Sequence, residues 1–258
     1  MTLRETFDEA PELYDRVRPG YPERLFDDLA SLAGLRPGSR VLELGSGTGQ
    51  ATVALARRGY EIVAIELGAG LAEVARRKLA PFPAARVVNA AFEPWPLPAE
   101  PFDVVFAATA FHWLDPEIRV MKSADALRPG GALAVVSTHH VAGGDTPFFA
   151  DAQRCYERWD PATPPGVRLE PAADIPFDRE QFDSGGRFAD VTFRRYEHEV
   201  AYSAQQYRDL LLSYSGHRAM EPEARHELLS CIDGLIRHRY GGHVAKRYMN
   251  ELAVARTT

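Results

Sequence analysis

The first half of the chain alternates between short apolar runs and segments whose apolar residues recur at helical spacing. The apolar runs predict buried strands at 40–45, 61–66, 85–90, 101–109 and 132–138. The segments between them carry apolar residues on one face, which predicts helices over 48–58, 71–79 and 120–127. Strands that are apolar throughout and separated by helices are typical of a parallel sheet covered on both faces. The pattern therefore predicts an α/β fold.

The pattern changes after this alternating region. Residues 139–187 are rich in proline and glycine and carry one predicted helix, over 148–159. The next predicted strand, 188–203, shifts its apolar residues from odd to even positions, which predicts a bulge or a break. Two helical patterns follow, and a last strand is predicted over 248–256, interrupted by Asn250, with a short helix as the alternative. A last strand of this kind suits an antiparallel position beside the parallel set.

Composition and charge limit the classes of partner. The net charge of -6 argues against nucleic acid, because a phosphate backbone requires a basic surface. The one basic segment, 237–247, is interpreted as a solvated helix end. The N-terminus lacks an apolar signal core and no apolar run is long enough to span a bilayer, so no membrane partner is expected. Cys155 and Cys231 are isolated without metal-ligand spacing, which predicts a reducing, cytoplasmic location.

A glycine-rich loop follows the first predicted strand in VLELGSGTGQ. Gly45, Gly47 and Gly49 allow the backbone to approach a ligand closely and leave helix N–H groups facing it. The spacing is G-x-G-x-G, and Gln50 stands where a dinucleotide fingerprint requires its third glycine. The loop therefore predicts a cofactor site, and the missing glycine counts against NAD.

Two carboxylates flank this loop. Glu43 lies inside an otherwise apolar strand, where it must accept hydrogen bonds from backbone amides or a bound ammonium group. A purely structural carboxylate that holds the glycine loop in place is the alternative, and both roles can coexist. Glu66 ends the second strand over the carboxyl edge of the sheet, where it can accept both hydroxyls of a ribose.

Together these features resemble the class I S-adenosylmethionine-dependent methyltransferases. The motifs that carry the resemblance are VLELGSGTG at 41–49, Glu66, FDVVFAATAFHWLDP at 102–116 and LRPGG at 127–131. The family implies a doubly wound, mostly parallel seven-stranded sheet (the Rossmann-like methyltransferase fold) with an antiparallel last strand and a small helical cap. It also implies methyl transfer from S-adenosylmethionine to a small-molecule acceptor by in-line displacement, with S-adenosylhomocysteine as the product. An NAD(P)-dependent oxidoreductase and a non-catalytic ligand-binding member of the fold are the alternatives.

The resemblance also assigns positions around the cofactor. Glu43 would lie near its amino group, Glu66 would bind the ribose and Leu67 would cover one face of the adenine. Phe92 would offer its backbone N–H to the adenine, although Ala91 stands where many relatives carry an aspartate. The other implied contacts are Gly45, Ser46, Gly47, Thr48 and Gly49 in the loop, Thr109, Ala110 and Phe111 after the fourth strand, and Tyr14 and Arg18 in an N-terminal lid.

We interpret residues 1–258 as a single methyltransferase domain. Its parts are an N-terminal lid with the first helix (1–36), a cofactor-binding core (37–138), an insertion (139–187), and C-terminal strands with two capping helices (188–258).

The histidines are the candidate proton acceptors. His112, beside Trp113 at the end of the fourth strand, is the candidate catalytic base, required only where the acceptor must lose a proton. A structural imidazole that shapes the loop is the alternative. Asp115 before Pro116 predicts an N-cap followed by proline at the first helical position.

Two further pairs of residues are candidates for ligand binding. His139 and His140 point to opposite faces of a strand, so no metal site is expected there or elsewhere, but either histidine could face the acceptor pocket. His217 and Arg218, between two predicted helices, are candidates on the substrate side, and an arginine would suit a carboxylate-bearing acceptor.

Overall fold

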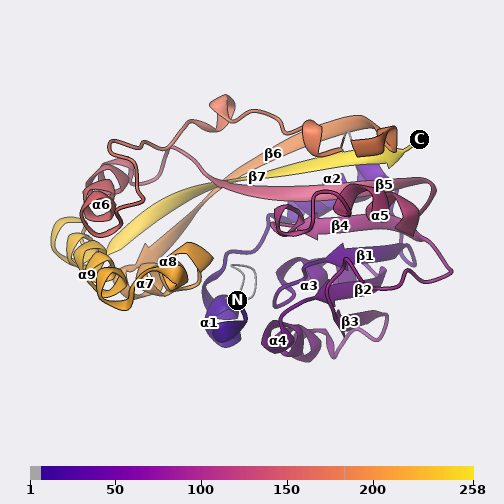
Figure 1. The fold of residues 1–258 in the computed structure, drawn as a ribbon, viewed down its shortest axis with the longest axis horizontal. Coiled ribbons are helices and arrows are strands. Elements are labelled where there is room, and N and C mark those ends of the chain that lie inside the picture. The colour runs from indigo at the N-terminus through magenta and orange to yellow at the C-terminus, as the bar shows by residue number, and fades with distance from the viewer. Residues whose placement is uncertain (1–6, 183) are drawn as a thin grey trace. The chain divides into compact units, whose positions relative to one another are not determined.

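The computed structural model describes residues 7–182 and 184–258. A seven-stranded sheet with the strand order β3-β2-β1-β4-β5-β7-β6 runs through it (Figure 1). The strands are β1 (Arg40–Leu44), β2 (Glu61–Glu66), β3 (Ala85–Asn89), β4 (Phe102–Ala108), β5 (Leu127–His140), β6 (Phe188–Ser203) and β7 (His243–Thr257). The helices are α1 (Pro11–Val17), α2 (Glu23–Ala33), α3 (Gln50–Arg57), α4 (Ala69–Leu79), α5 (Arg119–Ala126), α6 (Thr146–Trp159), α7 (Ala204–Leu212), α8 (Ser215–Ala219) and α9 (Pro222–Arg239). β1 to β5 pair in parallel and β7 is antiparallel, which confirms the predicted fold class.

The chain divides into two compact units, each built from three separate segments. The sheet unit comprises Gly20–Thr138, Phe177–Tyr196 and Asn250–Thr258. The helical unit comprises the described part of Met1–Pro19, together with His139–Pro176 and Glu197–Met249. Residues 139–176 of the predicted insertion therefore share a unit with the late helices, and residues 177–187 belong to the sheet unit.

The sheet unit buries apolar residues on both faces of its strands. Val41 belongs to one cluster, with side chains of α2 and α3, while Leu42 belongs to another, with side chains of α5. This alternation follows from the pleat, because neighbouring residues of a strand point to opposite faces. Strands covered in this way must be apolar at nearly every position, which is why the sequence predicted them closely.

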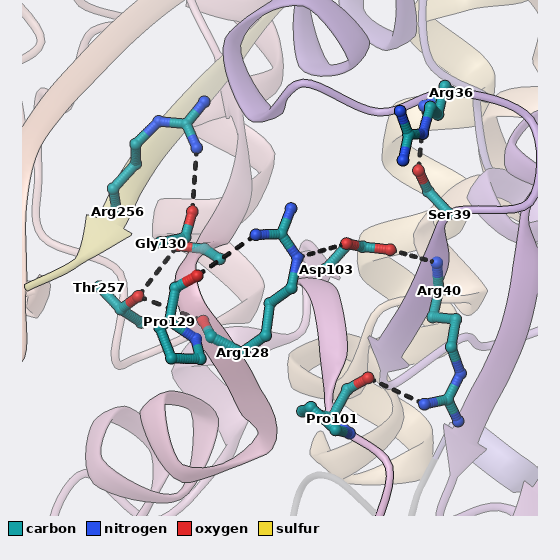
Figure 2. A network of polar contacts seen from close by, with 11 residues as sticks. Arg36, Ser39, Arg40, Pro101, Asp103, Arg128, Pro129, Gly130, Arg256 and Thr257 are labelled. Carbon is teal, nitrogen blue, oxygen red and sulfur yellow. Dashed lines mark hydrogen bonds and ion pairs between the residues drawn. The ribbon is translucent and has the colours of Figure 1, made fainter.

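The amino ends of β1, β4 and β5 are joined by a polar network (Figure 2). The Asp103 carboxylate accepts hydrogen bonds from the Arg40 backbone N–H at 2.8 Å and from Arg128 Nε at 2.5 Å. Partial burial works against ionisation of Asp103, but these two donors outweigh it and lower the pKa of the carboxyl. The network ties the strand ends opposite to the glycine loop and leaves the carboxyl edge of the sheet for a ligand.

The helical unit has an apolar core of its own. It is built from α6, α7 and α9, with contributions from α1 and from β6 and β7. Cys155 on α6 and Cys231 on α9 form a disulfide across 76 residues of sequence. The interpretation of these cysteines as isolated, reduced thiols was wrong, because the fold brings together two residues that are far apart along the chain.

Reduction of this disulfide is expected to lower the stability of the helical unit. Closing a loop of this length restricts the unfolded chain, and native disulfides typically stabilise a protein by about 2–4 kcal/mol. Thermal melts with and without dithiothreitol measure the effect. A Cys155→Ser, Cys231→Ser double variant is the control, since its melting temperature should not respond to the reductant. Titration of two free thiols in the unreduced wild-type protein would contradict the disulfide.

Two local predictions can be compared with the structure. The shift of apolar positions along β6 occurs without the predicted break, because the strand serves different cores: Phe193 packs in one cluster of the sheet unit, Tyr196 in the other, and Tyr202 in the helical unit. The alternative of a bulge stays a prediction. Asp115 was wrongly predicted as the N-cap of the next helix. Its carboxylate accepts the Glu117 N–H at 2.9 Å in a turn, and α5 begins only at Arg119.

Candidate functional site

The glycine loop adopts a conformation that favours glycine at each of its three glycine positions. The φ angles are 68° at Gly45, 55° at Gly47 and 84° at Gly49, all in the left-handed region. A side chain at Gly45 would also place its Cβ 2.5 Å from the Cβ of Ala110. The loop therefore passes close to Ala110 at the end of β4, and no larger residue could replace Gly45 without a shift of one of the two segments.

Glu66 holds this loop in place. Its carboxylate accepts the Gly47 N–H at 2.7 Å through one oxygen and the Gly68 N–H at 2.8 Å through the other. Glu66 thus has the structural role that the sequence predicted as an alternative for Glu43. The contact of Glu66 with ribose hydroxyls stays a prediction.

Glu43 is buried beneath the loop, with 1% of its surface exposed. One of its oxygens, Oε2, has no hydrogen-bond partner among the described residues. Burial raises the pKa of this carboxyl to about 8, with the nearby polar side chain of Thr52 opposing the shift and the charge of Glu66 adding to it. An unpartnered buried carboxylate is costly, so the site is suited to a cationic group that has still to be supplied.

The loop residues Ser46 and Thr48 are also buried, and the hydroxyl of Ser46 has no partner among the described residues. Ser46 donates its backbone N–H to Ile65 O at 3.1 Å, as Gly45 does at 2.8 Å. The backbone is therefore fixed by β2, while the Ser46 hydroxyl and Glu43 Oε2 have no partner among the described residues. Both groups lie within the segment that the sequence assigned to the cofactor.

The end of β4 carries a chain of hydrogen-bonded side chains. Thr109 has a φ of 56°, which is uncommon for a β-branched residue and is a form of backbone strain often found at functional sites. Its hydroxyl lies 3.0 Å from the hydroxyls of both Tyr21 and Thr138, and Asn250 donates to Thr138 at 2.8 Å. The sequence analysis selected Thr109 but missed the other three. Asn250, a polar residue that interrupts an apolar strand, was the signal that could have found them.

The remaining residues that the resemblance assigned to the cofactor differ in their exposure to solvent. Phe111 and Phe92 are each 2% exposed and lie in the core. Leu67 is half-buried directly after β2, and its carbonyl accepts the Asn89 side chain at 2.8 Å. The backbone contact that the resemblance assigned to Phe92 stays a prediction.

His112 lies in a 3-10 turn, Phe111–Trp113, that follows β4. The His112 side chain is exposed at the surface, and its ring centroid is 4.9 Å from that of Trp113. Partial desolvation by surrounding protein atoms and the nearby charge of Arg119 lower the pKa of the imidazole. His112 is therefore neutral at pH 7 and can accept a proton, so it retains the chemical property that a base requires.

Tyr14 and Arg18 belong to the helical unit. The Arg18 guanidinium carbon lies 4.8 Å from the ring centroid of Tyr14 and 4.3 Å from that of Tyr214. One nitrogen of Arg18 donates to Ser213 O at 2.7 Å, while the buried Nε has no partner among the described residues. Arg18 is thus held between aromatic rings with donor capacity left over, and its predicted contact with a carboxylate stays a prediction.

The other candidates are placed as follows. His217 Nε2 lies 2.9 Å from the Tyr156 hydroxyl, and Arg218 forms an ion pair with Glu9 at 2.7 Å. Arg218 is therefore engaged within the protein. In the described part of the chain, no group of three or more histidine, cysteine, aspartate or glutamate residues is placed to hold a metal ion, and no described helix is long and apolar enough to cross a membrane.

Comparisons with known proteins agree with this geometry. Residues 42–135 match the family described as a methyltransferase domain. An uncharacterized methyltransferase of Mycobacterium tuberculosis is 37% identical over 131 residues, which cover 51% of this chain and 51% of that protein. Another, of Schizosaccharomyces pombe, is 24% identical over 225 residues, covering 87% of this chain and 84% of that protein.

Solved structures extend the match to most of the chain. A protein assigned as a type II methyltransferase from Anaeromyxobacter dehalogenans has a TM-score of 0.65 at 25% identity, covering 93% of this chain and 97% of that chain. By contrast, the chain spans about half the length of the mycobacterial relatives that it matches.

Proposed function

We propose that this chain, which belongs to the class I S-adenosylmethionine-dependent methyltransferases, transfers a methyl group from S-adenosylmethionine to a small-molecule acceptor by in-line displacement. The observation that carries the proposal is the unpartnered, buried oxygen of Glu43 beneath the glycine loop. A carboxylate in that position is suited to the α-ammonium group of S-adenosylmethionine. A nicotinamide dinucleotide carries no ammonium group and would leave this oxygen unpaired.

The residues present fit the cofactor at both ends. Glu43 would hold its ammonium group, and the N–H groups and small residues of the loop 45–49 would lie along its methionine portion. Glu66, at the carboxyl end of β2, would accept the ribose hydroxyls. Leu67 and the backbone of Phe92 would border the adenine, in place of the aspartate that Ala91 replaces.

Bound S-adenosylmethionine supplies a methyl group that is activated by its bond to a sulfonium sulfur. The leaving group of the transfer is a neutral thioether. The protein then has to orient the two reactants and keep water away, and orientation alone can lower a barrier by about 7–11 kcal/mol. The chain Tyr21–Thr109–Thr138–Asn250 fixes the backbone at the end of β4. We propose that Thr109 and Ala110 of this segment position the methionine end of the cofactor.

His112 is proposed as the general base where the acceptor has a proton to lose. Its support is its place directly after the positioning segment and a lowered pKa that leaves the ring neutral at pH 7. A His112→Ala variant should keep its affinity for S-adenosylhomocysteine and lose turnover with such an acceptor. Unchanged turnover would reduce His112 to a residue that shapes the loop.

A small molecule, rather than a nucleic acid or a membrane, is proposed as the partner. The net charge of -6 supports the choice of partner. The Cys155–Cys231 disulfide counts against a reducing compartment, where such bonds are rare. Thiol labelling in intact cells would decide the location.

Calorimetric titration of the purified chain tests the proposed activity. S-adenosylhomocysteine should bind with a single site per chain, and NADH should not bind. Binding of NADH without binding of S-adenosylhomocysteine would overturn the proposal. Binding of S-adenosylhomocysteine with no methyl transfer to any acceptor in a broad screen would point to a non-catalytic member of the fold.

A further inference from the structure

The helical unit contains a cavity of about 350 Å³ that none of the cofactor residues line. A volume of this size is typical of small-molecule sites. Most of its wall is apolar or aromatic and includes Phe149, Tyr156 and Tyr207. Among the described residues that line it, none is an aspartate or a glutamate, whereas Lys246 and Arg168 both contribute.

Lys246 is the unusual member of this wall. It is only 5% exposed, although lysine is rarely buried without a partner of opposite charge. Its ammonium donates to the Tyr214 hydroxyl at 3.2 Å and lies 5.3 Å and 4.9 Å from the ring centroids of Tyr214 and Tyr248. It forms no ion pair with any described carboxylate. Aromatic rings partly compensate such a charge, but they do not neutralise it.

The other polar groups of the cavity leave this positive charge uncompensated. Burial and the charge of Lys246 lower the pKa of His140 to about 3, and burial acts with Lys246 to bring that of His217 to about 4, so both rings are neutral. The Nε2 atom of His140 is buried and has no partner among the described residues. Asp160, the carboxylate whose charge reaches His217, is engaged by the Thr163 hydroxyl at 2.9 Å.

Tyr214 responds to the same excess of positive charge. Burial opposes its ionisation, but the charges of Lys246 and Arg18 outweigh burial and lower the pKa of the phenol. The cavity thus combines an apolar body with a buried cation, a phenol and a free imidazole nitrogen. This set of groups matches a ligand that has one anionic end and an apolar remainder.

We propose that this cavity binds a small apolar or aromatic carboxylic acid, whose carboxylate is held by Lys246. The Tyr214 hydroxyl and His140 Nε2 are placed to complete its hydrogen bonds, and Phe149 and Tyr207 contact its apolar part. This extends the sequence-based idea of a carboxylate-bearing acceptor to a different cation, since Arg218 is paired with Glu9. Identifying the bound acid with the methyl acceptor rests on the proposed function, whereas the binding site itself does not.

A matched pair of ligands tests the site in the whole protein. Binding of 3-phenylpropionate and of its neutral amide, 3-phenylpropanamide, is measured by calorimetry at neutral pH, with S-adenosylhomocysteine titrated separately. We expect the acid to bind the wild-type chain about ten- to a hundredfold more tightly than the amide, as expected for one charged hydrogen-bonded contact. Equal binding of the two, or binding of neither while S-adenosylhomocysteine still binds, would overturn the inference and leave the proposed function intact.

Lys246→Met separates this role from a structural one. Because the ammonium has no carboxylate partner, replacing it with an apolar side chain of similar length should leave the melting temperature unchanged or raise it. The preference for the acid over the amide should disappear, with S-adenosylhomocysteine affinity unaltered. Lys78→Met, at the end of α4 in the sheet unit, is the control and should retain the preference. A Lys246→Met variant that keeps the full preference for the acid over the amide would show that Lys246 does not hold the carboxylate. Failure of the wild type to bind S-adenosylhomocysteine would instead count against the proposed function.

Discussion

Replacing Glu66 with alanine is expected to weaken S-adenosylhomocysteine binding by about a hundredfold to ten-thousandfold. Two hydrogen bonds from ribose hydroxyls to a carboxylate contribute roughly 1.5–3 kcal/mol each, and their loss gives this range. The same substitution removes the acceptors of the Gly47 and Gly68 N–H groups, which lie 2.7 Å and 2.8 Å from the carboxylate oxygens. The glycine loop should therefore also lose order, which adds to the loss of affinity.

Calorimetric titration measures the effect, and Glu61→Ala is the matched control. Glu61 begins the same strand that Glu66 ends, but its side chain is exposed and its ion-pair contact with Arg40 is 3.9 Å long. It should bind S-adenosylhomocysteine as the wild type does. If Glu66→Ala binds as tightly as this control, the ribose lies elsewhere and the assignment of Glu66 is wrong.

Glu43 should make cofactor binding depend on pH. With a pKa of about 8, its carboxyl is mostly protonated at pH 7 in the free protein, yet holding an ammonium group requires the carboxylate. Binding must therefore release a proton, and affinity for S-adenosylhomocysteine should rise by up to about tenfold per unit between pH 6 and pH 8. Glu43→Gln should bind weakly and with little dependence on pH. A wild-type affinity that does not change over this range would contradict the assignment.

The same group should affect stability in the opposite direction. The folded-state pKa of about 8 lies above the ordinary value of 4.5, so the folded protein holds the proton more tightly than the unfolded chain. The stability that this group contributes is present in full below pH 4.5 and is lost as the pH rises through about 8. Above that pH, Glu43→Gln should be more stable than the wild type by a few kcal/mol, on the order set by the shift. Thermal melts across the range measure this, and a wild-type melting temperature that rises toward alkaline pH would contradict it.

The positions of the buried strands were predictable because burial on both faces leaves little choice of residue. β2 was predicted at 61–66, which is where the structure has it, and Glu66 was therefore placed correctly at its end. The three glycines of the loop were also evident, since a close approach of the backbone and left-handed φ angles favour glycine. These are local constraints, and they can be recognised without knowing what the segment packs against.

Contacts between distant segments could not be found in this way. The Glu66 carboxylate accepts a hydrogen bond from the Gly47 N–H, 19 residues away in sequence. Through this contact Glu66, rather than Glu43, holds the glycine loop in place. Asp115 shows that a short sequence motif can be ambiguous. An aspartate before a proline occurs in turns as well as at helix N-termini, and here it lies in a turn.

The sequence by itself determined the α/β class, the order of the elements in the core and the identity of the loop and its two acids. It did so because hydrophobic periodicity and backbone sterics act over a few residues. Only the tertiary structure decided that Cys155 meets Cys231, and that Lys246, which the sequence placed in a solvated basic segment, is buried beside a cavity. Burial and electrostatics depend on residues that are brought together from distant parts of the chain, and it is these properties that give Glu43 its raised pKa and Lys246 its unpaired charge.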